Sequence, residues 1–189
     1  MLDRLRARLE GYLTGLGMRF SKAGLSPTSW TMVGLAVSIL AAYSYSASSY
    51  RGEVVGGVLV LISGFFDLVD GAVARVTGKT SMKGAFVDST LDRVAEVTIF
   101  AGILVGHYGS AISILLALST SLLVSYTRAK GDALGISLSG VGIGERSERL
   151  IIIAVASIIG LLGWGVIIVL IVAAFTFLER IYRALKALP

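Results

Sequence analysis

The sequence predicts an all-α integral membrane protein, a single domain over residues 1–189 with six transmembrane helices preceded by an N-terminal amphipathic interfacial helix. Hydrophobic residues make up 55% of the chain, charged residues only 15%, and the mean hydropathy is +0.84. A soluble domain carries about 25% charged residues. In addition, apolar runs long enough to span a bilayer, roughly 20 residues each, recur along the chain.

The first 24 residues are expected to form the interfacial helix. Leucines recur at helical spacing with arginines, among them Arg4 and Arg8, beside them; the leucines are Leu2, Leu5, Leu9 and Leu13. An apolar stripe flanked by basic residues is typical of a helix lying in the headgroup plane. The alternative is a basic tail without fixed structure.

The six-helix core is expected over residues 29–185. Its spans are predicted at about residues 29–47, 54–75, 84–106, 109–129, 147–163 and 165–185. The sequence "GLLGWG" predicts a tight glycine turn between the last two spans.

Basic residues gather on one side of this topology. They precede span one, lie between spans two and three and between spans four and five, and close the chain; the opposite-side turns offer Arg51 and little else. By the positive-inside rule, both termini and both charged loops are cytoplasmic. The sequence thus predicts a multi-pass protein of the plasma membrane with its charged face in the cytoplasm.

Four aspartates occupy the loop-proximal ends of spans two and three. Asp67 and Asp70 are three residues apart, and Asp88 and Asp92 are four apart, so each pair shares one helical face. Small residues continue these faces, namely Gly71, Ala74 and Gly84. Two carboxylate faces can therefore meet across a gap that is open to a ligand.

Clustered aspartates in a membrane protein need cationic compensation. An ionised aspartate at bilayer depth costs about 2.5–3.5 kcal/mol on insertion scales. Pairing with Arg75 and Arg93 is the purely structural alternative, but two arginines do not balance four aspartates. Oxygen ligands suit Mg²⁺ or Mn²⁺, and two such ions would resemble the metal clamps of phosphoryl-transfer sites.

A diphosphate would fit between these helices. Possible phosphate donors lie in the connecting loop, namely Lys79, Thr80, Ser81 and Lys83, and Arg75 could help to neutralise the phosphates. An aspartate that metal does not saturate could accept a proton from an attacking hydroxyl. Asp92 lies farthest from the loop and is the candidate base.

The full spacing is Asp67-x2-Asp70-Gly71-x2-Ala74-Arg75-x8-Gly84-x3-Asp88-x3-Asp92. This pattern resembles the signature of the CDP-alcohol phosphotransferase family, and with the six spans the resemblance covers nearly the whole chain. It implies a homodimer whose site opens to the cytoplasm. It also implies that Asp67, Asp70 and Asp88 hold two divalent ions, while Asp92 acts as base and also contacts a metal.

The same resemblance assigns contacts with the nucleotide. Gly71, Arg75 and Ser81 would contact the CDP moiety. The segment "SPTSWT" is similar to a Pro-Asn-x-x-Thr segment that precedes span one in this family. Thr28 stands where the family usually has Asn, and Thr28 and Thr31 are the nucleotide contacts expected here.

The basic residues of the second charged loop and the last helix predict an anionic acceptor, because Arg binds phosphate with bidentate geometry. Snorkelling anchors against anionic lipid are the alternative, which suits Arg183 and Lys186. The segment "GERSERL" resembles a Glu-Arg-x-x-Arg-Leu piece of the family branch that uses inositol phosphate, the prokaryotic phosphatidylinositol-phosphate synthases. By that resemblance the acceptor-phosphate pocket consists of Arg128, Lys130, Arg149 and Arg180, with Arg146 in support.

The predicted reaction moves a lipid phosphate group from CDP-diacylglycerol or CDP-archaeol to inositol phosphate and releases CMP. Glycerol 3-phosphate is an alternative acceptor, because it is also anionic. A divalent-cation transporter and a lipid-binding scaffold without turnover are alternatives from other classes. The bilayer and a second copy of the chain are expected partners, and nucleic acid is not.

Overall fold

The computed structural model describes residues 10–188, and all regular structure in this range is helical. The helices are α2 (Glu10–Ser21), α3 (Pro27–Ser46), α4 (Tyr50–Val76), α5 (Met82–Val105), α6 (Ala111–Ala133), α7 (Arg146–Ile158) and α8 (Leu162–Ala187). The α2 helix lies within the predicted residues 1–24, whereas Leu2, Leu5 and Leu9 fall outside the described residues. Its placement in the headgroup plane stays a prediction.

Serine residues define where four of the helices begin. Ser26, Ser49, Ser81 and Ser110 are N-caps, and the hydroxyl of each accepts a hydrogen bond from a backbone N–H in the first turn that follows. The α4 helix therefore starts at Tyr50, before the predicted residue 54. The apolar pattern missed this polar first turn because it follows hydrophobicity and not capping.

The α7 helix is shorter than its predicted span. It has 13 residues and ends at Ile158, and Gly160 follows with a positive φ of 74° in the predicted glycine turn. Thirteen residues rise about 20 Å, less than the roughly 30 Å of a hydrocarbon core. Within residues 10–188, three helices are long and apolar enough to cross a membrane, namely α4, α6 and α8. A count of six spans stays a prediction.

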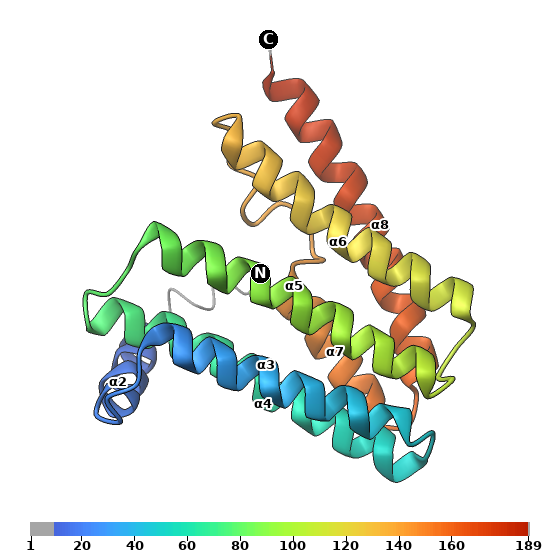
Figure 1. The fold of residues 1–189 in the computed structure, drawn as a ribbon. Coiled ribbons are helices and arrows are strands. Elements are labelled where there is room, and N and C mark those ends of the chain that lie inside the picture. Colours follow the sequence, from blue (N-terminus) through green and yellow to red (C-terminus); the bar gives the residue numbers. More distant parts are fainter. Residues whose placement is uncertain (1–9, 189) are drawn as a thin grey trace.

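The helices form a body and a projecting arm (Figure 1). In the body, α3 packs closely against α4 and α5, α7 packs against α4, and α2 crosses the end of α4. The arm is the pair α6 and α8, and α7 also packs against α8. One apolar core runs through both parts and includes Ile99 and Ile103 of α5, Ile153 of α7 and Val169 of α8.

Close contact between helices depends on small residues. A Cβ atom at Gly57 of α4 would lie 2.7 Å from Ser157 Cβ and 2.8 Å from the Ala154 carbonyl oxygen of α7. A Cβ atom at Gly17 of α2 would lie 2.6 Å from the Ala72 carbonyl oxygen of α4. Glycine at these positions lets the backbones approach, as in other membrane helix interfaces.

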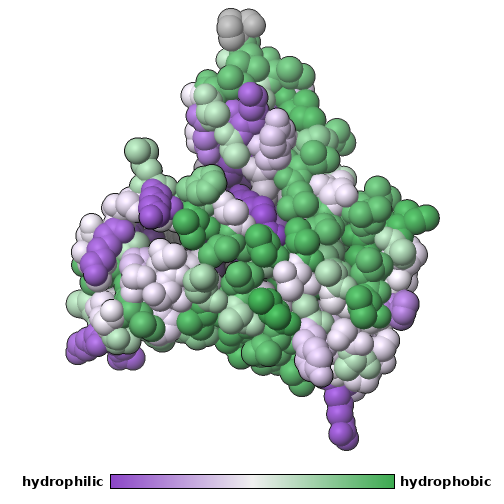
Figure 2. All heavy atoms as spheres, viewed as in Figure 1, coloured by the Kyte–Doolittle hydropathy of each residue, from purple (hydrophilic) through white to green (hydrophobic). Residues whose placement is uncertain are grey.

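Apolar side chains cover most of the visible face in Figure 2, as is expected of a protein surrounded by lipid. Hydrophilic residues gather at the tips of the molecule and in the recess between the arm and the body (Figure 2). The C-terminal halves of α4, α6 and α8, the first half of α5 and the first turn of α7 hold the four aspartates and the basic residues predicted for the acceptor.

Candidate metal and phosphate site

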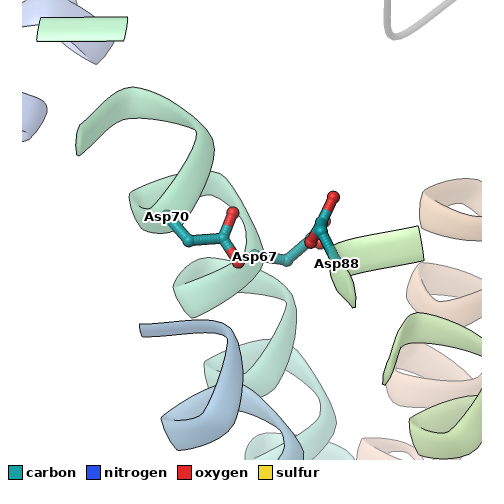
Figure 3. A group of neighbouring side chains, drawn as sticks. All are labelled: Asp67, Asp70 and Asp88. Carbon is teal, nitrogen blue, oxygen red and sulfur yellow. The ribbon is translucent and has the colours of Figure 1, made fainter. Parts of the chain in front are cut away.

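Three of the four aspartates converge between α4 and α5. Asp67, Asp70 and Asp88 each offer a carboxylate oxygen, and these oxygens all lie within 4.8 Å of one another. Figure 3 shows the carboxylate groups of Asp67 and Asp70, one turn apart on α4, beside that of Asp88 on α5. The prediction that carboxylates from two neighbouring helices meet is therefore confirmed for these three residues.

The donor set fits a hard divalent cation. The Asp70 residue is only 5% exposed, and its Oδ2 atom is buried with no hydrogen-bond partner among the described residues. A buried carboxylate oxygen without a partner is costly. Coordination by Mg²⁺ or Mn²⁺ would satisfy this oxygen, since both ions prefer carboxylate ligands.

Asp92 lies beside this group of three and faces cationic side chains. Arg146 Nη1, from the first residue of α7, is 2.7 Å from Asp92 Oδ1 and 3.5 Å from Asp67 Oδ1. Arg93 Nη1 is 3.7 Å from Asp92 Oδ2. Asp67, Asp70 and Asp88 thus share a metal-binding geometry, while Arg146 bridges Asp67 of this group and Asp92 outside it. The expectation that Asp92 also contacts a metal ion stays a prediction.

A pocket extends from the aspartates into the bundle. Its lining comes from α3, α4, α5 and the first residue of α7, and consists of Thr31, Gly34, Leu35, Ser63, Asp67, Asp70, Leu91, Asp92, Ala95 and Arg146. Of the two predicted threonine contacts, Thr31 lies in this pocket, whereas Thr28 is exposed on the first turn of α3. Sequence reasoning missed the apolar part of the lining, because Gly34, Leu35 and Ala95 carry no chemical signature.

The other predicted nucleotide contacts lie in the last two turns of α4 and at the N-cap of α5. Arg75 is exposed, and its Nη1 would lie 3.4 Å from a Cβ atom at Gly71. The absence of a side chain at Gly71 therefore leaves room beside the Arg75 guanidinium. Ser81 caps α5, where its hydroxyl accepts the Gly84 N–H at 3.0 Å. The hydroxyl proton of Ser81 is still available to a phosphate.

The basic residues predicted for the acceptor have different environments. Arg128 and Lys130 are exposed near the end of α6. Arg180 of α8 is buried, and its guanidinium donates to the carbonyl oxygens of Val141 and Val124 at 3.1 and 2.8 Å. Arg128 and Arg146 therefore offer more to an incoming phosphate, and Arg146 Nε has no hydrogen-bond partner within residues 10–188.

Arg149 differs most from the prediction of an acceptor-phosphate ligand. Its side chain is fully buried and donates to Glu96 Oε1 from Nε at 2.9 Å and from Nη2 at 2.8 Å. Its Nη1 donates to the Gly144 carbonyl oxygen at 2.6 Å. In this structure, therefore, internal groups occupy the guanidinium of Arg149. The sequence could not reveal this because the partner is 53 residues away.

Glu145 is a functional candidate to which the sequence analysis gave no role, although it is the first residue of the Glu-Arg-x-x-Arg-Leu motif. It is the N-cap of α7 and forms a capping box with Glu148. Its Oε1 atom accepts the Gly140 N–H at 3.0 Å and lies 3.4 Å from Arg180 Nη2 and 3.7 Å from Arg128 Nη1. Glu145 therefore holds the loop before α7 against two of the predicted phosphate-binding arginines. Two sequence signals pointed to it, the Glu-Arg-x-x-Arg-Leu motif and the capping-box spacing Glu145-x2-Glu148.

Comparison with known proteins gives matches over most of the chain. Residues 25–179 match the family model described as CDP-alcohol phosphatidyltransferase. The archaetidylinositol phosphate synthase of Pyrococcus horikoshii is 35% identical over 188 residues, covering 100% of this chain and 98% of the relative. The phosphatidylinositol phosphate synthase of Streptomyces avermitilis is 39% identical over 160 residues, covering 80% of this chain and 64% of the relative.

Solved structures agree with the sequence comparison. Phosphatidylinositol phosphate synthase of Mycobacterium tuberculosis with CDP-DAG bound superposes with a TM-score of 0.80 at 26% identity, covering 91% of this chain and 92% of that one. The same protein in complex with manganese and citrate gives a TM-score of 0.81 at 26% identity, covering 92% and 89%. These neighbours therefore have the fold of this chain.

Proposed function

The chain belongs to the CDP-alcohol phosphatidyltransferase family, and from this premise we propose that it transfers the lipid phosphate group of a CDP-lipid to inositol phosphate, releasing CMP. The observation that carries the proposal is the convergence of Asp67, Asp70 and Asp88 next to Arg146 from α7. Acidic groups suit the metal-bound diphosphate of the donor, and basic groups suit an acceptor that carries a phosphate.

The donor side rests on the three carboxylates and the pocket beside them. Asp67, Asp70 and Asp88 would hold divalent ions, proposed as two Mg²⁺ or Mn²⁺, which supply positive charge to the diphosphate and to the departing CMP. Thr31 lines the pocket, and exposed Arg75 lies beside Gly71, the residue that follows Asp70 on α4. These residues would orient the CDP group while the lipid chains remain in the bilayer.

The acceptor side rests on the cations near Asp92. Arg146 has one guanidinium nitrogen on Asp92 and a buried Nε without a partner in the described part of the chain. Arg128 and Lys130 are exposed at the end of α6. Together they would bind the phosphate of the acceptor by charge-assisted hydrogen bonds, which are about twice as strong as neutral ones.

The proposed proton transfer uses Asp92. The acceptor hydroxyl oxygen attacks the lipid-side phosphorus and forms a new P–O bond, while the bond from that phosphorus to the bridging oxygen breaks. The electron pair of this bond leaves with CMP, and the hydroxyl proton passes to a carboxylate oxygen of Asp92. Holding donor and acceptor in line supplies much of the acceleration in such transfers.

Three observations favour this reading over the alternatives. Both named relatives are synthases of inositol-phosphate lipids, and one structural neighbour contains CDP-DAG. The family match favours an enzyme over a divalent-cation transporter or an inactive scaffold. Glycerol 3-phosphate is the remaining rival acceptor, because the same cations would bind its phosphate.

The test is CMP release by the purified protein in detergent with Mg²⁺ or Mn²⁺. CDP-diacylglycerol and CDP-archaeol are each offered with inositol phosphate, glycerol 3-phosphate or serine. We expect turnover with inositol phosphate and at least one of the two donors. Turnover with glycerol 3-phosphate and none with inositol phosphate would overturn the proposed acceptor, and turnover with serine alone would overturn the role of the basic residues.

A further inference from the structure

Glu53 is a buried acid at the end of the bundle opposite the site. It lies in the first turn of α4, is 7% exposed, and precedes Asp67 by 14 residues, a rise of about 21 Å along the helix. Its Oε1 atom accepts the backbone N–H of Leu162, the first residue of α8, at 2.8 Å. Within residues 10–188, the other buried acids are Asp70 in the site and Glu96, which forms an ion pair. Buried acids in membrane helices are rare and usually functional.

The contact with Leu162 takes the place of a local helix cap. Leu161, the N-cap residue of α8, makes no side-chain capping hydrogen bond. A carboxylate at a helix N-terminus also interacts favourably with the helix dipole. Serine or aspartate at position 161 would supply a cap without burying an acid from another helix. What Glu53 adds is a link between the first turn of α4 and the first turn of α8.

Neighbouring turns are joined at the same end of the bundle. Ser48 Oγ donates to the Gly106 carbonyl oxygen at 2.6 Å, and the Tyr108 hydroxyl donates to the Ser49 carbonyl oxygen at 2.9 Å. These bonds connect the turn before α4 with the turn before α6, and Glu53 adds the start of α8. The turns before α4, α6 and α8 are therefore tied together by hydrogen bonds.

From this common end, α4 and α8 diverge. Figure 1 shows the C-terminal end of α4 in the body and that of α8 in the arm, far from each other. The two helices are not among the pairs of described helices whose backbones pack closely, and α8 packs against α6 and α7 instead. Arg180 of α8 holds the carbonyl oxygens of Val124 on α6 and of Val141 in the loop before α7. The direction of α8 therefore sets the place of the arm and of this loop relative to the body.

A small change at the start of α8 becomes a larger one at its C-terminal end. The helix has 26 residues and is about 39 Å long, so a tilt of about 5° moves its last turn by about 3 Å. A misplacement of about 1 Å can lower a reaction rate about 100-fold. The hydrogen bond that fixes the start of α8 can therefore influence the reaction from the opposite end of the bundle.

We propose that Glu53 is a positioning residue, which holds the start of α8 on the start of α4 and so sets how far the arm stands from the aspartates of the body. The inference rests on the proposed function, because it concerns the geometry of the same site. The rise of about 21 Å between Glu53 and Asp67 keeps Glu53 out of reach of the reacting groups. An effect of Glu53 on turnover is thus an effect of position and not of substrate contact.

The first test measures the distance between arm and body in the full-length protein. The chain contains no cysteine, so Met82→Cys on α5 and Leu185→Cys on α8, both at exposed positions, provide one pair of spin labels. Labelled chains are diluted with unlabelled chains, so that double electron–electron resonance reports distances within one chain. We expect Glu53→Met to shift the mean distance by about 3 Å or to broaden its distribution. Glu53→Gln should keep the wild-type distribution, because its amide oxygen still accepts the Leu162 N–H.

The second test measures CMP release by the same Glu53 variants without labels. We expect Glu53→Met to lower kcat about tenfold or more, the scale of misplaced reacting groups, and Glu53→Gln to stay within about threefold of wild type. The Mn²⁺ affinity, followed by electron paramagnetic resonance, should stay within about threefold of wild type in both variants. The reason is that the aspartates proposed as ligands lie on α4 and α5, which belong to the body.

Tyr45→Phe is the matched control. It removes another buried hydrogen bond between helices, the contact of 2.8 Å between the Tyr45 hydroxyl on α3 and Ser157 Oγ on α7. Neither helix belongs to the arm, so the label distance and kcat should stay at wild-type values, although the thermal unfolding temperature is expected to fall. If Glu53→Met does not fold, Glu53→Asp provides the same comparison, because its shorter side chain cannot reach Leu162 without moving α8.

Two results would overturn the inference. The first is a folded Glu53→Met protein, or Glu53→Asp in its place, with either the wild-type label distance or the wild-type kcat. The second is an equal loss of kcat in Tyr45→Phe, which would assign the effect to stability alone. Failure of the proposed function is seen separately, as an absence of turnover with inositol phosphate in the wild-type protein. The label distances need no turnover, and kcat can be compared with any acceptor that is turned over.

Discussion

Arg146 Nη1 of α7 lies 2.7 Å from Asp92 Oδ1 of α5, so the fourth aspartate of the signature is paired with a cation from a helix far along the chain. Replacing Arg146 by Gln should lower kcat about 10- to 100-fold, because one charge-assisted hydrogen bond is lost. The KM for the acceptor should rise more than the KM for the CDP-lipid. Steady-state kinetics with each substrate varied in turn checks this, with exposed Arg183→Gln as the control.

Asp92→Asn should separate binding from turnover. The amide cannot accept the hydroxyl proton, so CMP release should fall about 100-fold or more, the scale of general-base loss. Binding of the CDP-lipid and of Mn²⁺ should persist, because Asp67, Asp70 and Asp88 remain in place. Unchanged CMP release would remove Asp92 from the role of base.

Asp70→Asn should weaken the binding of the divalent metal ion. It replaces a buried carboxylate whose Oδ2 has no protein partner within the described range. We expect the Mn²⁺ affinity to fall by about tenfold or more, since even indirect disturbance of metal ligands costs 10- to 100-fold. Exposed Asp132→Asn is the control and should bind Mn²⁺ normally.

Removal of divalent ions should abolish turnover in the wild-type protein. Exhaustive chelation is expected to stop CMP release, and addition of Mg²⁺ or Mn²⁺ should restore it, because the carboxylates would otherwise repel the diphosphate of the donor. Full activity after chelation, checked by metal analysis of the same sample, would contradict a metal role for this site.

Gly57→Ala should destabilise the contact between α4 and α7. The new methyl group would lie 2.8 Å from a backbone oxygen of α7, and overpacking of this kind costs about 1–3 kcal/mol. Gly64→Ala in the same helix is the matched control, since a Cβ atom there has no neighbour within 4 Å. Thermal unfolding in detergent should show a lower transition temperature for Gly57→Ala only.

The predicted helices agree with the structure in number and approximate position, which follow from apolar composition and periodicity. Each of the six predicted spans contains most of one helix from α3 to α8, and the glycine turn before α8 is present. The observed helix ends differ from the predicted ones where a capping residue sets them, as at Ser49 before α4. The shortness of α7 was not visible in an apolar run that continues through the turn.

The sequence by itself determined which side chains share a helical face, because the spacing of Asp67 with Asp70 and of Asp88 with Asp92 fixes their direction around a helix axis. It also indicated the metal chemistry, since four carboxylates need a cation. Only the tertiary structure decided which partners these groups reach. Three carboxylates meet between α4 and α5, Arg146 bridges Asp67 and Asp92, and Glu96 forms an ion pair with Arg149. The reason is that spacing sets the direction of a side chain within one helix, whereas the partner it reaches depends on how two helices pack.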